Sequence, residues 1–395
     1  MAEIIFVISI SPIIYTYFVY PLILWLLRVF FKKPIDKKDI TPSVSLIIAA
    51  YNEEKNIRRK IEDSLNIDYP KDKMEVIVAS DCSTDETDKI VKEYEDKGVR
   101  LARLSERKGK TAAQNNAVSI AKGEILVFSD APTMYKSNAI KKLVRNYNDK
   151  KIGFVTGEVI YTNETNSGVG EGGSLYWKYE SWIKRMESDI GSVIGAAGCI
   201  YSMRRSLYTP FDEDYISDFI APLRLITNSE NFGSSLKTAK VCHNGFRSIM
   251  ESEAISIEKT SKSQKEEFKM RCRVVTRAIF GLSHMRRVLN PFRYPRYSFE
   301  LFSHKILRWL APVFMIIVFM SNLLLLEDKF YYTTFQLQLL FYILAFFGYF
   351  MDKAKLPRVK VFFIPYYFCV INLAVLTGIF KCIIGKRDKI WTPAR

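Results

Sequence analysis

Apolar residues gather into long blocks near both ends of the chain, and a mixed, charged stretch separates them. The first block, residues 4–31, carries no charge before Arg28 and is long enough to cross about 30 Å of hydrocarbon. It begins with Met-Ala-Glu and is followed by basic residues, whereas a signal peptide has a basic start, a shorter apolar core and a small-residue cleavage site. We therefore expect a retained membrane helix over residues 1–33.

Three further apolar blocks lie near the C-terminus, at residues 306–326, 330–350 and 361–384. Lengths near 20 residues with almost no internal charge favour membrane helices over the buried helices of a soluble domain. We expect a membrane region of about three helices over residues 305–385, followed by a basic tail at 386–395. The spans show no repeat and no clear intramembrane charge, which disfavours a transporter.

The positive charges predict a topology for these spans. Lys32, Lys33 and their basic neighbours follow the first block, which places the middle of the chain on the cytoplasmic side of the plasma or inner membrane. The basic break at 351–360 agrees with this placement. The basic tail would lie outside if the last block crossed fully, so either that block is re-entrant, with a break near Pro365, or the charge rule fails at this end.

A net charge of +16 is compatible with nucleic acid, anionic lipid or phosphorylated ligands as partners. No nucleic-acid-binding motif is visible, and many basic residues lie beside the spans, so membrane lipid and phosphorylated ligands are favoured and no nucleic-acid partner is expected. The six cysteines form no Cys-x-x-Cys pair, which argues against a zinc site and a disulfide framework.

The middle of the chain alternates between predicted strands and helices. Short apolar runs at 44–50, 74–79, 99–104 and 124–129 predict buried strands, with helices between them, as in a parallel sheet with covering helices. Asn52, Asp81 and Asp130 follow three of these strands. Each alone is compatible with an ordinary turn, but ligands bind beyond the carboxyl ends of such strands, so the three together favour a binding site. Dinucleotide-binding and P-loop glycine motifs are missing from the sequence, which disfavours those classes.

Six stretches follow one another in a fixed order: SLIIAAYNEE at 45–54, ASDCSTDET at 79–87, RKGKTAAQN at 107–115, FSDAPT at 128–133, GAAGCIYSMRR at 195–205 and ISDF at 216–219. Together they resemble the family 2 glycosyltransferases, and the resemblance covers roughly residues 43–285. The flanking spans are similar to the polysaccharide-synthase branch of that family, which includes hyaluronan, chitin, poly-N-acetylglucosamine and cellulose synthases. The resemblance implies an α/β catalytic domain of the GT-A fold with a mostly parallel central sheet, here at 34–263, followed by amphipathic interfacial helices at 264–304.

The resemblance also implies an activity and a set of site residues. The expected enzyme is an inverting hexosyltransferase that passes a sugar from a nucleotide-sugar, with a UDP-sugar as the first candidate, to a lipid-linked or glycan acceptor. Asp218 falls where the family keeps its catalytic base, and Asp212, Glu213 and Asp214 are rivals close in sequence. The donor would be bound by Asn52, Glu53, Asp81, Ser83, Lys108, Lys110, Asn115, Asp130 and Arg273. The acceptor would contact Gly198, Tyr176 and Trp177, and Asp130 would bind Mg2+ or Mn2+.

Two positions depart from the family pattern. The second aspartate of the Asp-x-Asp motif is Pro132, which has no side-chain oxygen, so a metal would rest on Asp130, the phosphates and water. The Gln-x-x-Arg-Trp motif of polymerising members corresponds to Met270-Arg-Cys-Arg-Val274, in which Arg273 fills the arginine position. A single transfer and a processive synthase therefore both remain open, as does a non-catalytic sugar-nucleotide sensor or membrane scaffold. The surrounding helix, residues 264–287, is amphipathic and would lie at an anionic membrane surface or pack on the core.

Overall fold

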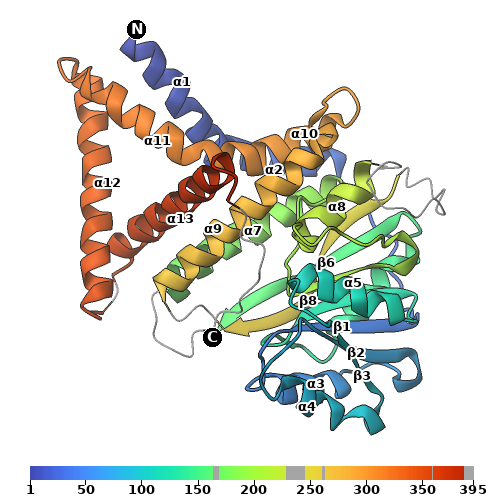
Figure 1. Cartoon of the computed structure of the whole chain (residues 1–395). Helices are drawn as coiled ribbons and strands as arrows, with labels where there is room; N and C mark the ends of the chain where they lie inside the picture. The colour runs from blue at the N-terminus through green and yellow to red at the C-terminus, as the bar shows by residue number, and fades with distance from the viewer. Residues whose placement is uncertain (163–168, 228–244, 260–262, 358, 387–395) are drawn as a thin grey trace.

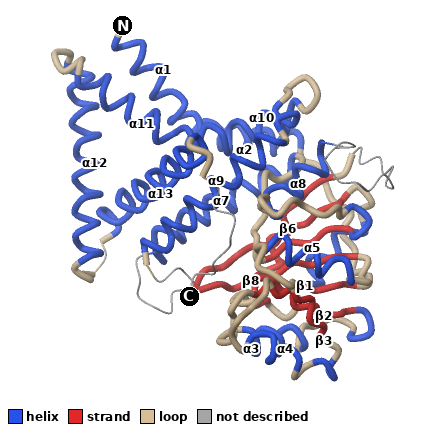
Figure 2. The backbone as a smooth tube through the Cα atoms, in the orientation of Figure 1, coloured by secondary structure: helices blue, strands red, loops and turns tan. Residues whose placement is uncertain are grey.

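The computed structural model describes residues 1–162, 169–227, 245–259, 263–357 and 359–386. An α/β domain built on one twisted sheet lies beside a group of long helices from both ends of the chain (Figure 1). The tube view in Figure 2 separates the two parts clearly, with all strands in the first and none in the second.

The sheet has eight strands among the described residues, in the order β3-β2-β1-β4-β7-β6-β8-β5. Strands β3, β2, β1 and β4 are parallel to one another, β6 is parallel to β8, and β7 runs antiparallel to both of its neighbours. The strands are β1 (Val44–Ala50), β2 (Met74–Ser80), β3 (Val99–Arg103), β4 (Ile125–Asp130), β5 (Met134–Tyr135), β6 (Ile152–Thr162), β7 (Ile200–Arg204) and β8 (Arg247–Lys259). The predicted parallel sheet is confirmed, and its four predicted strands end within one residue of their expected positions.

The parallel strands form because their apolar side chains are buried on both faces of the sheet. Every residue of β1 is buried: Leu46 and Ile48 pack on one face, and Ile47 packs on the other. The first face is covered by α3 (Ile57–Leu65), α4 (Thr87–Lys92) and α6 (Ala139–Val144). The second face is covered by α5 (Lys110–Ile120), α8 (Ser217–Thr227) and α9 (Gln264–His284).

Four helical segments of the described chain are long and apolar enough to cross a membrane: Ala2–Phe31, Pro295–Leu323, Lys329–Lys353 and Lys360–Ile383. The first joins α1 (Ala2–Ile14) to α2 (Tyr20–Phe31), and the second joins α10 (Pro295–Leu301) to α11 (Leu307–Leu323), each through one wider helical turn. The third and fourth are α12 (Lys329–Lys353) and α13 (Lys360–Ile383). Helix α13 contains Pro365 and continues past it, so the break considered at that proline is not found.

The expectation that the spans hold no clear charge is wrong for the second span. Helix α10–α11 begins before the apolar block and includes Glu300, His304, Lys305 and Arg308. His304 is fully buried, and the side chains of Glu300 and Arg308 are 1% and 10% exposed. These groups face the protein, where other side chains pair with them.

Helix α9 packs between the α/β domain and α13. Its Val275 and Leu282 are buried, Gly281 lies against Ile220 of α8, and Gly378 of α13 lies against Val275. The flanking arginines do not all face outward: the guanidinium of Arg277 donates to the backbone carbonyls of residues 213, 214 and 215. The packing alternative for the amphipathic helix is therefore favoured for this face, and contact of α9 with lipid stays a prediction.

The remaining long helix, α7 (Val169–Ile190), connects the two parts of the molecule. Its Ile183, Met186 and Ile190 form a buried cluster with Tyr20 and Leu24 of α2. The α/β domain is thereby fixed to helix α2 of the first candidate span.

Candidate active site

The turns after β1 and β2 are tied to each other by hydrogen bonds. Asn52 and Cys82 adopt φ values of 51° and 57°, a left-handed conformation that few residues other than glycine adopt. The Asn52 amide oxygen accepts from the Thr84 backbone N–H at 2.8 Å, and the Asn52 N–H donates to Ser83 Oγ at 3.2 Å. These contacts fix the ends of both strands at one edge of the sheet.

Asp81, at the end of β2, organises the loop that leads into α5. One oxygen of its buried carboxylate accepts from the backbone N–H groups of Lys108 and Gly109, both at 2.8 Å. Burial raises the pKa of Asp81, while these two hydrogen bonds and Arg107 oppose that rise. The Arg107 guanidinium lies 3.7 Å from the centre of the Tyr51 ring, so a cation and an aromatic face stand beside this loop.

Four predicted residues meet at the centre of the site. The Lys110 ammonium forms an ion pair with Asp130 and donates to the carbonyl of Gly198 at 3.1 Å. The carboxylate of Asp218 lies directly on Gly198: a Cβ added there would be 2.1 Å from Asp218 Oδ2. The carboxylate and lysine expected on the donor side, the turn expected on the acceptor side and the predicted base are therefore adjacent in the fold.

The charges around Asp218 act on its pKa in opposite directions. Burial raises that pKa, and the negative charge of Asp130 adds to the rise. Lys110, Lys184 and Arg277 lower it. A carboxylate with a raised pKa is a stronger base than an exposed one, which suits proton removal from a hydroxyl group.

These residues line one cavity of about 1730 Å³. It extends from the strand ends to side chains of α7, α9, α11 and α13, so it reaches the helices that are apolar enough for a membrane. The predicted site residues that line it are Asn52, Glu53, Lys110, Asp130, Tyr176, Trp177, Gly198, Asp218 and Arg273.

Four predicted donor residues do not line the cavity: Asp81, Ser83, Lys108 and Asn115. The first two shape its edge, as described above, and Lys108 pairs with Glu106 at 2.9 Å. The Asn115 amide donates to the Phe211 carbonyl and accepts from the Tyr208 hydroxyl, both at 2.7 Å. Its contacts hold the 208–211 segment in place, and its role in donor binding stays a prediction.

The rivals of Asp218 for the role of base lie outside the cavity. Asp212 and Glu213 are exposed, and neither they nor Asp214 line it. The geometry favours Asp218 among the four.

The aromatic residues expected to contact the acceptor surround an arginine. The Arg271 guanidinium lies 4.7 Å from the ring centres of both Tyr176 and Trp177, and it pairs with Glu267 at 2.8 Å. Tyr161 stacks on Trp177 with ring centres 5.1 Å apart. Aromatic faces of this kind are suited to stacking against a sugar ring.

Glu258 and Lys184 are among the charged residues of the cavity that were not expected from the sequence. Glu258 comes from β8, where Ile257 pairs with Met134 of β5, so it lies close to the turn that follows Asp130. Burial and the charge of Asp130 raise the pKa of Glu258 to about 7. Lys184 comes from α7 and is 7% exposed. The sequence around Glu258 alternates polar and apolar residues, and Glu180 and Lys184 lie four residues apart in a helix. Both patterns are typical of solvated faces, so neither pattern indicated a site residue.

A metal would find limited support from protein side chains. Among the described residues, no group of three or more His, Cys, Asp or Glu side chains is placed to hold an ion. Asp130 offers one carboxylate, and Mg2+ is commonly bound through one or two carboxylates together with substrate phosphates and water. The residues present therefore fit a cation that arrives with a diphosphate.

Residues 45–209 match the family model described as Glycosyl transferase family 2. This part of the chain is similar to family 2 glycosyltransferase domains. The match spans the first five motifs that suggested the resemblance, from the first strand to the acceptor-side turn. The match agrees with the resemblance found in the sequence and with the expected enzyme class, and the observed sheet confirms the expected α/β fold.

Curated relatives support the same family over part of the chain. A probable glycosyltransferase of Bacillus subtilis, YdaM, is 35% identical over 123 residues, which cover 30% of this chain and 29% of that protein. A poly-beta-1,6-N-acetyl-D-glucosamine synthase of Staphylococcus aureus is 28% identical over 196 residues, 48% of this chain and 47% of that protein. The chain thus spans about a third to a half of the length of these relatives.

A solved structure extends the likeness to the whole molecule. The mannosyltransferase PcManGT from Pyrobaculum calidifontis, determined with GDP-Man and Mn2+, aligns with a TM-score of 0.70 and 19% identity over 97% of this chain and all of that chain. The shared fold includes the helices from both ends of the chain.

Proposed function

We propose that the protein transfers a sugar from a nucleotide-sugar to a lipid-linked or glycan acceptor at the cytoplasmic face of the cell membrane. The observation that carries the proposal is the meeting of Asp130, Lys110, Gly198 and Asp218 in one cavity that continues to the apolar helices. A donor at the strand ends and an acceptor from the membrane side would meet at Asp218.

The donor side would bind the diphosphate. Lys110 is placed to neutralise a phosphate because it stands between Asp130 and Gly198 in the cavity. A divalent cation, Mg2+ or Mn2+, held by Asp130 and the diphosphate would supply further positive charge to the leaving group. The neighbour solved with Mn2+ supports this role, and so does the single accessible carboxylate at the end of β4. A UDP-sugar remains the first candidate donor.

The acceptor side would supply the nucleophile. Asp218 would take the proton of an acceptor hydroxyl as its oxygen forms a bond to the anomeric carbon, and the nucleoside diphosphate would leave with the electron pair of the broken C–O bond. Attack from the side opposite the leaving group inverts the anomeric centre. The position of Asp218 beside Gly198 and close to the pair formed by Lys110 and Asp130 supports its role as the base in this course.

The membrane placement follows from the charges at the helix ends. The domain boundaries expected from the sequence stay part of the proposal: a first span at 1–33, a catalytic domain at 34–263, an interfacial region at 264–304 and a C-terminal span region at 305–385. The expected basic tail at 386–395 lies, apart from residue 386, outside the described residues. The catalytic domain would face the cytoplasm because basic residues follow the first span.

Transfer of labelled sugar tests this proposal. Purified protein in native lipid extract would be given a panel of labelled UDP- and GDP-sugars, with and without Mg2+ or Mn2+. Label in the lipid or glycan fraction from one donor is the expected result, and the length of the product separates single transfer from polymerisation. Label in neither fraction, from any donor, would overturn the proposal.

A further inference from the structure

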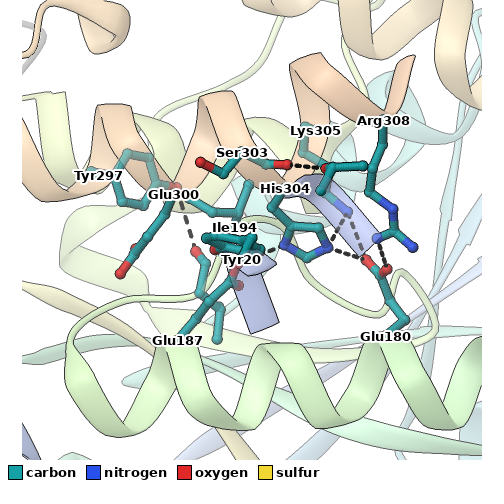
Figure 3. A network of polar contacts seen from close by, with 12 residues as sticks. Tyr20, Glu180, Glu187, Ile194, Tyr297, Glu300, Ser303, His304, Lys305 and Arg308 are labelled. Atoms are coloured by element: carbon teal, nitrogen blue, oxygen red, sulfur yellow. Dashed lines mark hydrogen bonds and ion pairs between the residues drawn. The ribbon is translucent and has the colours of Figure 1, made fainter. Parts of the chain in front are cut away.

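A buried polar network joins α7 to the second span (Figure 3). Glu180 of α7 receives three partners from the α10–α11 helix: His304 Nε2 at 3.0 Å, Lys305 Nζ at 2.7 Å and Arg308 Nη1 at 2.6 Å. The other nitrogen of His304 lies 2.6 Å from Glu187, which also accepts from the Tyr20 hydroxyl at 2.9 Å. Figure 3 shows Lys305 and Arg308 reaching from the helix toward the same carboxylate.

The network carries more positive than negative charge on its cavity side. The single carboxylate of Glu180 is shared by a lysine, an arginine and an imidazole, and it lines the cavity together with Lys305 and Arg308. Burial raises the pKa of Glu180, but its cationic partners outweigh burial and hold that pKa well below its usual range. Glu180 is therefore ionised and fully used by its present partners.

One cation beside this network has no partner of its own. Lys184 lies one helical turn after Glu180, is 7% exposed and lines the cavity. Within the described residues, its ammonium forms no hydrogen bond or ion pair. Burial and the charge of Lys305 lower its pKa, while Glu180, Glu187 and Asp218 are the nearby charges that favour its protonated form. A buried ammonium is costly unless it is paired, so a ligand with negative charge would satisfy it.

We propose that Lys184, with Lys305 and Arg308 beside it, forms a subsite for an anionic group of the acceptor, either a phosphate or a carboxylate. This inference rests on the proposed function and names the chemical class of the acceptor. The subsite lies on the membrane-helix side of Asp218, so the anionic group would enter from the membrane while the attacking hydroxyl faces the base. A diphosphate of a lipid carrier and a uronic acid of a glycan are the two sources of such a group.

Two pairs of probes that differ only in charge test the subsite. Farnesyl diphosphate is compared with farnesol, and octyl glucuronide with octyl glucoside. Each is titrated into the full chain in phosphatidylcholine nanodiscs, with saturating nucleoside diphosphate to fill the donor side. Binding is followed by the fluorescence of Trp177 and Trp309, which line the cavity.

The wild type is expected to prefer the charged member of at least one pair by about tenfold in Kd, a typical size for a charge-assisted contact. The pair that shows the preference identifies phosphate or carboxylate as the recognised group. Lys184→Gln should reduce the preference below threefold, whereas Lys178→Gln, an exposed lysine of the same helix, should keep it. Equal binding of charged and neutral probes by the wild type, or an unchanged preference in Lys184→Gln, overturns the proposal.

Two further measurements separate the possible failures. The wild-type comparison needs no variant, so the test holds even if Lys184→Gln does not fold, and Lys184→Arg should retain the preference. Donor turnover without acceptor is measured on the same preparations. Turnover with no preference for charged probes contradicts the anionic subsite alone, and a preference without turnover on any donor contradicts the proposed transferase function alone.

Discussion

Replacing Gly198 with alanine tests whether the acceptor-side turn positions the base. The Cβ of alanine would lie 2.1 Å from Asp218 Oδ2 and 3.2 Å from its Cγ, whereas ordinary contacts begin near 3.4 Å. Gly198 does not adopt a left-handed backbone conformation, so alanine fits the main chain. The substitution therefore acts on the neighbouring carboxylate and leaves the fold intact.

The size of the effect follows from the displacement. The carboxylate must move by 1.3 Å, the difference between 3.4 Å and 2.1 Å. A misplacement of about 1 Å at a reacting group costs on the order of 100-fold in rate, or about 2.7 kcal/mol of activation free energy. We expect kcat of Gly198→Ala to fall about 100-fold while the Kd of the donor nucleotide changes by less than about threefold.

A double-mutant cycle with Asp218→Asn gives the decisive comparison. If Gly198 acts through Asp218, alanine at 198 should lower transfer little further once the carboxylate is gone, because the two losses are not additive for residues in contact. The assay is initial-rate transfer together with nucleotide binding by calorimetry. A kcat within threefold of wild type for Gly198→Ala, or fully additive losses in the double variant, would refute the reasoning.

Three more predictions address the donor side and the stability of the domain. Asp130→Ala should weaken nucleotide binding about tenfold or more in the presence of Mn2+ and little in its absence, as measured by calorimetry; equal affinities with and without the ion would exclude Asp130 as a ligand. Glu251→Gln should lower the thermal midpoint by several degrees, because the buried carboxylate pairs with Lys37 and Arg145 at 2.8 and 3.1 Å. The expected loss of unfolding free energy is roughly 2 kcal/mol, since Lys37 can still be solvated when its partner is removed. An unchanged midpoint would show that the pairs are energetically neutral. Burial lowers the pKa of Lys60 from 10.5 to about 8, so the unfolded chain binds that proton more tightly than the folded chain does. The stability of the wild type relative to Lys60→Met should therefore rise between about pH 8 and 10.5. A stability difference that stays constant over this pH range in denaturation scans would contradict the lowered pKa of the buried Lys60.

The sheet could be predicted because its strands are buried on both faces. An apolar run such as 44–50, bounded by polar turns, has few other stable arrangements, and β1 follows it residue for residue. The spans were visible for a related reason, since lipid requires long uncharged stretches. The ends of these helices were harder to predict. The second candidate span begins at Pro295, before the apolar block, and the charged residues of its first turns are buried against α7. Those turns therefore have no apolar pattern in the sequence.

Sequence motifs predicted the residues at the centre of the site but not the residues around it. Asp130 and Asp218 occupy motif positions, and the fold places both in one cavity with Lys110. Glu258 and Lys184 reach that cavity through strand pairing and helix packing between segments far apart in the sequence. Local sequence patterns cannot predict contacts of this kind.

The same limit explains two other outcomes. Asn115 belongs to a motif, yet its amide holds the 208–211 segment, because a conspicuous polar residue can serve the scaffold of a site. The amphipathic pattern of α9 predicted an apolar stripe but not what packs on it. In the structure, α9 packs against both the catalytic domain and α13.

The most direct test of the account compares wild type and Asp218→Asn in two measurements on the same preparations. Release of nucleoside diphosphate from a panel of nucleotide-sugars is followed in lipid nanodiscs with native lipid extract, and binding of the same nucleotide is measured by calorimetry. The account predicts release from one donor by the wild type, loss of at least about 1000-fold in Asp218→Asn, and nucleotide affinity within about threefold for the two proteins. Full activity in Asp218→Asn, or no release from any donor by the wild type, would contradict it.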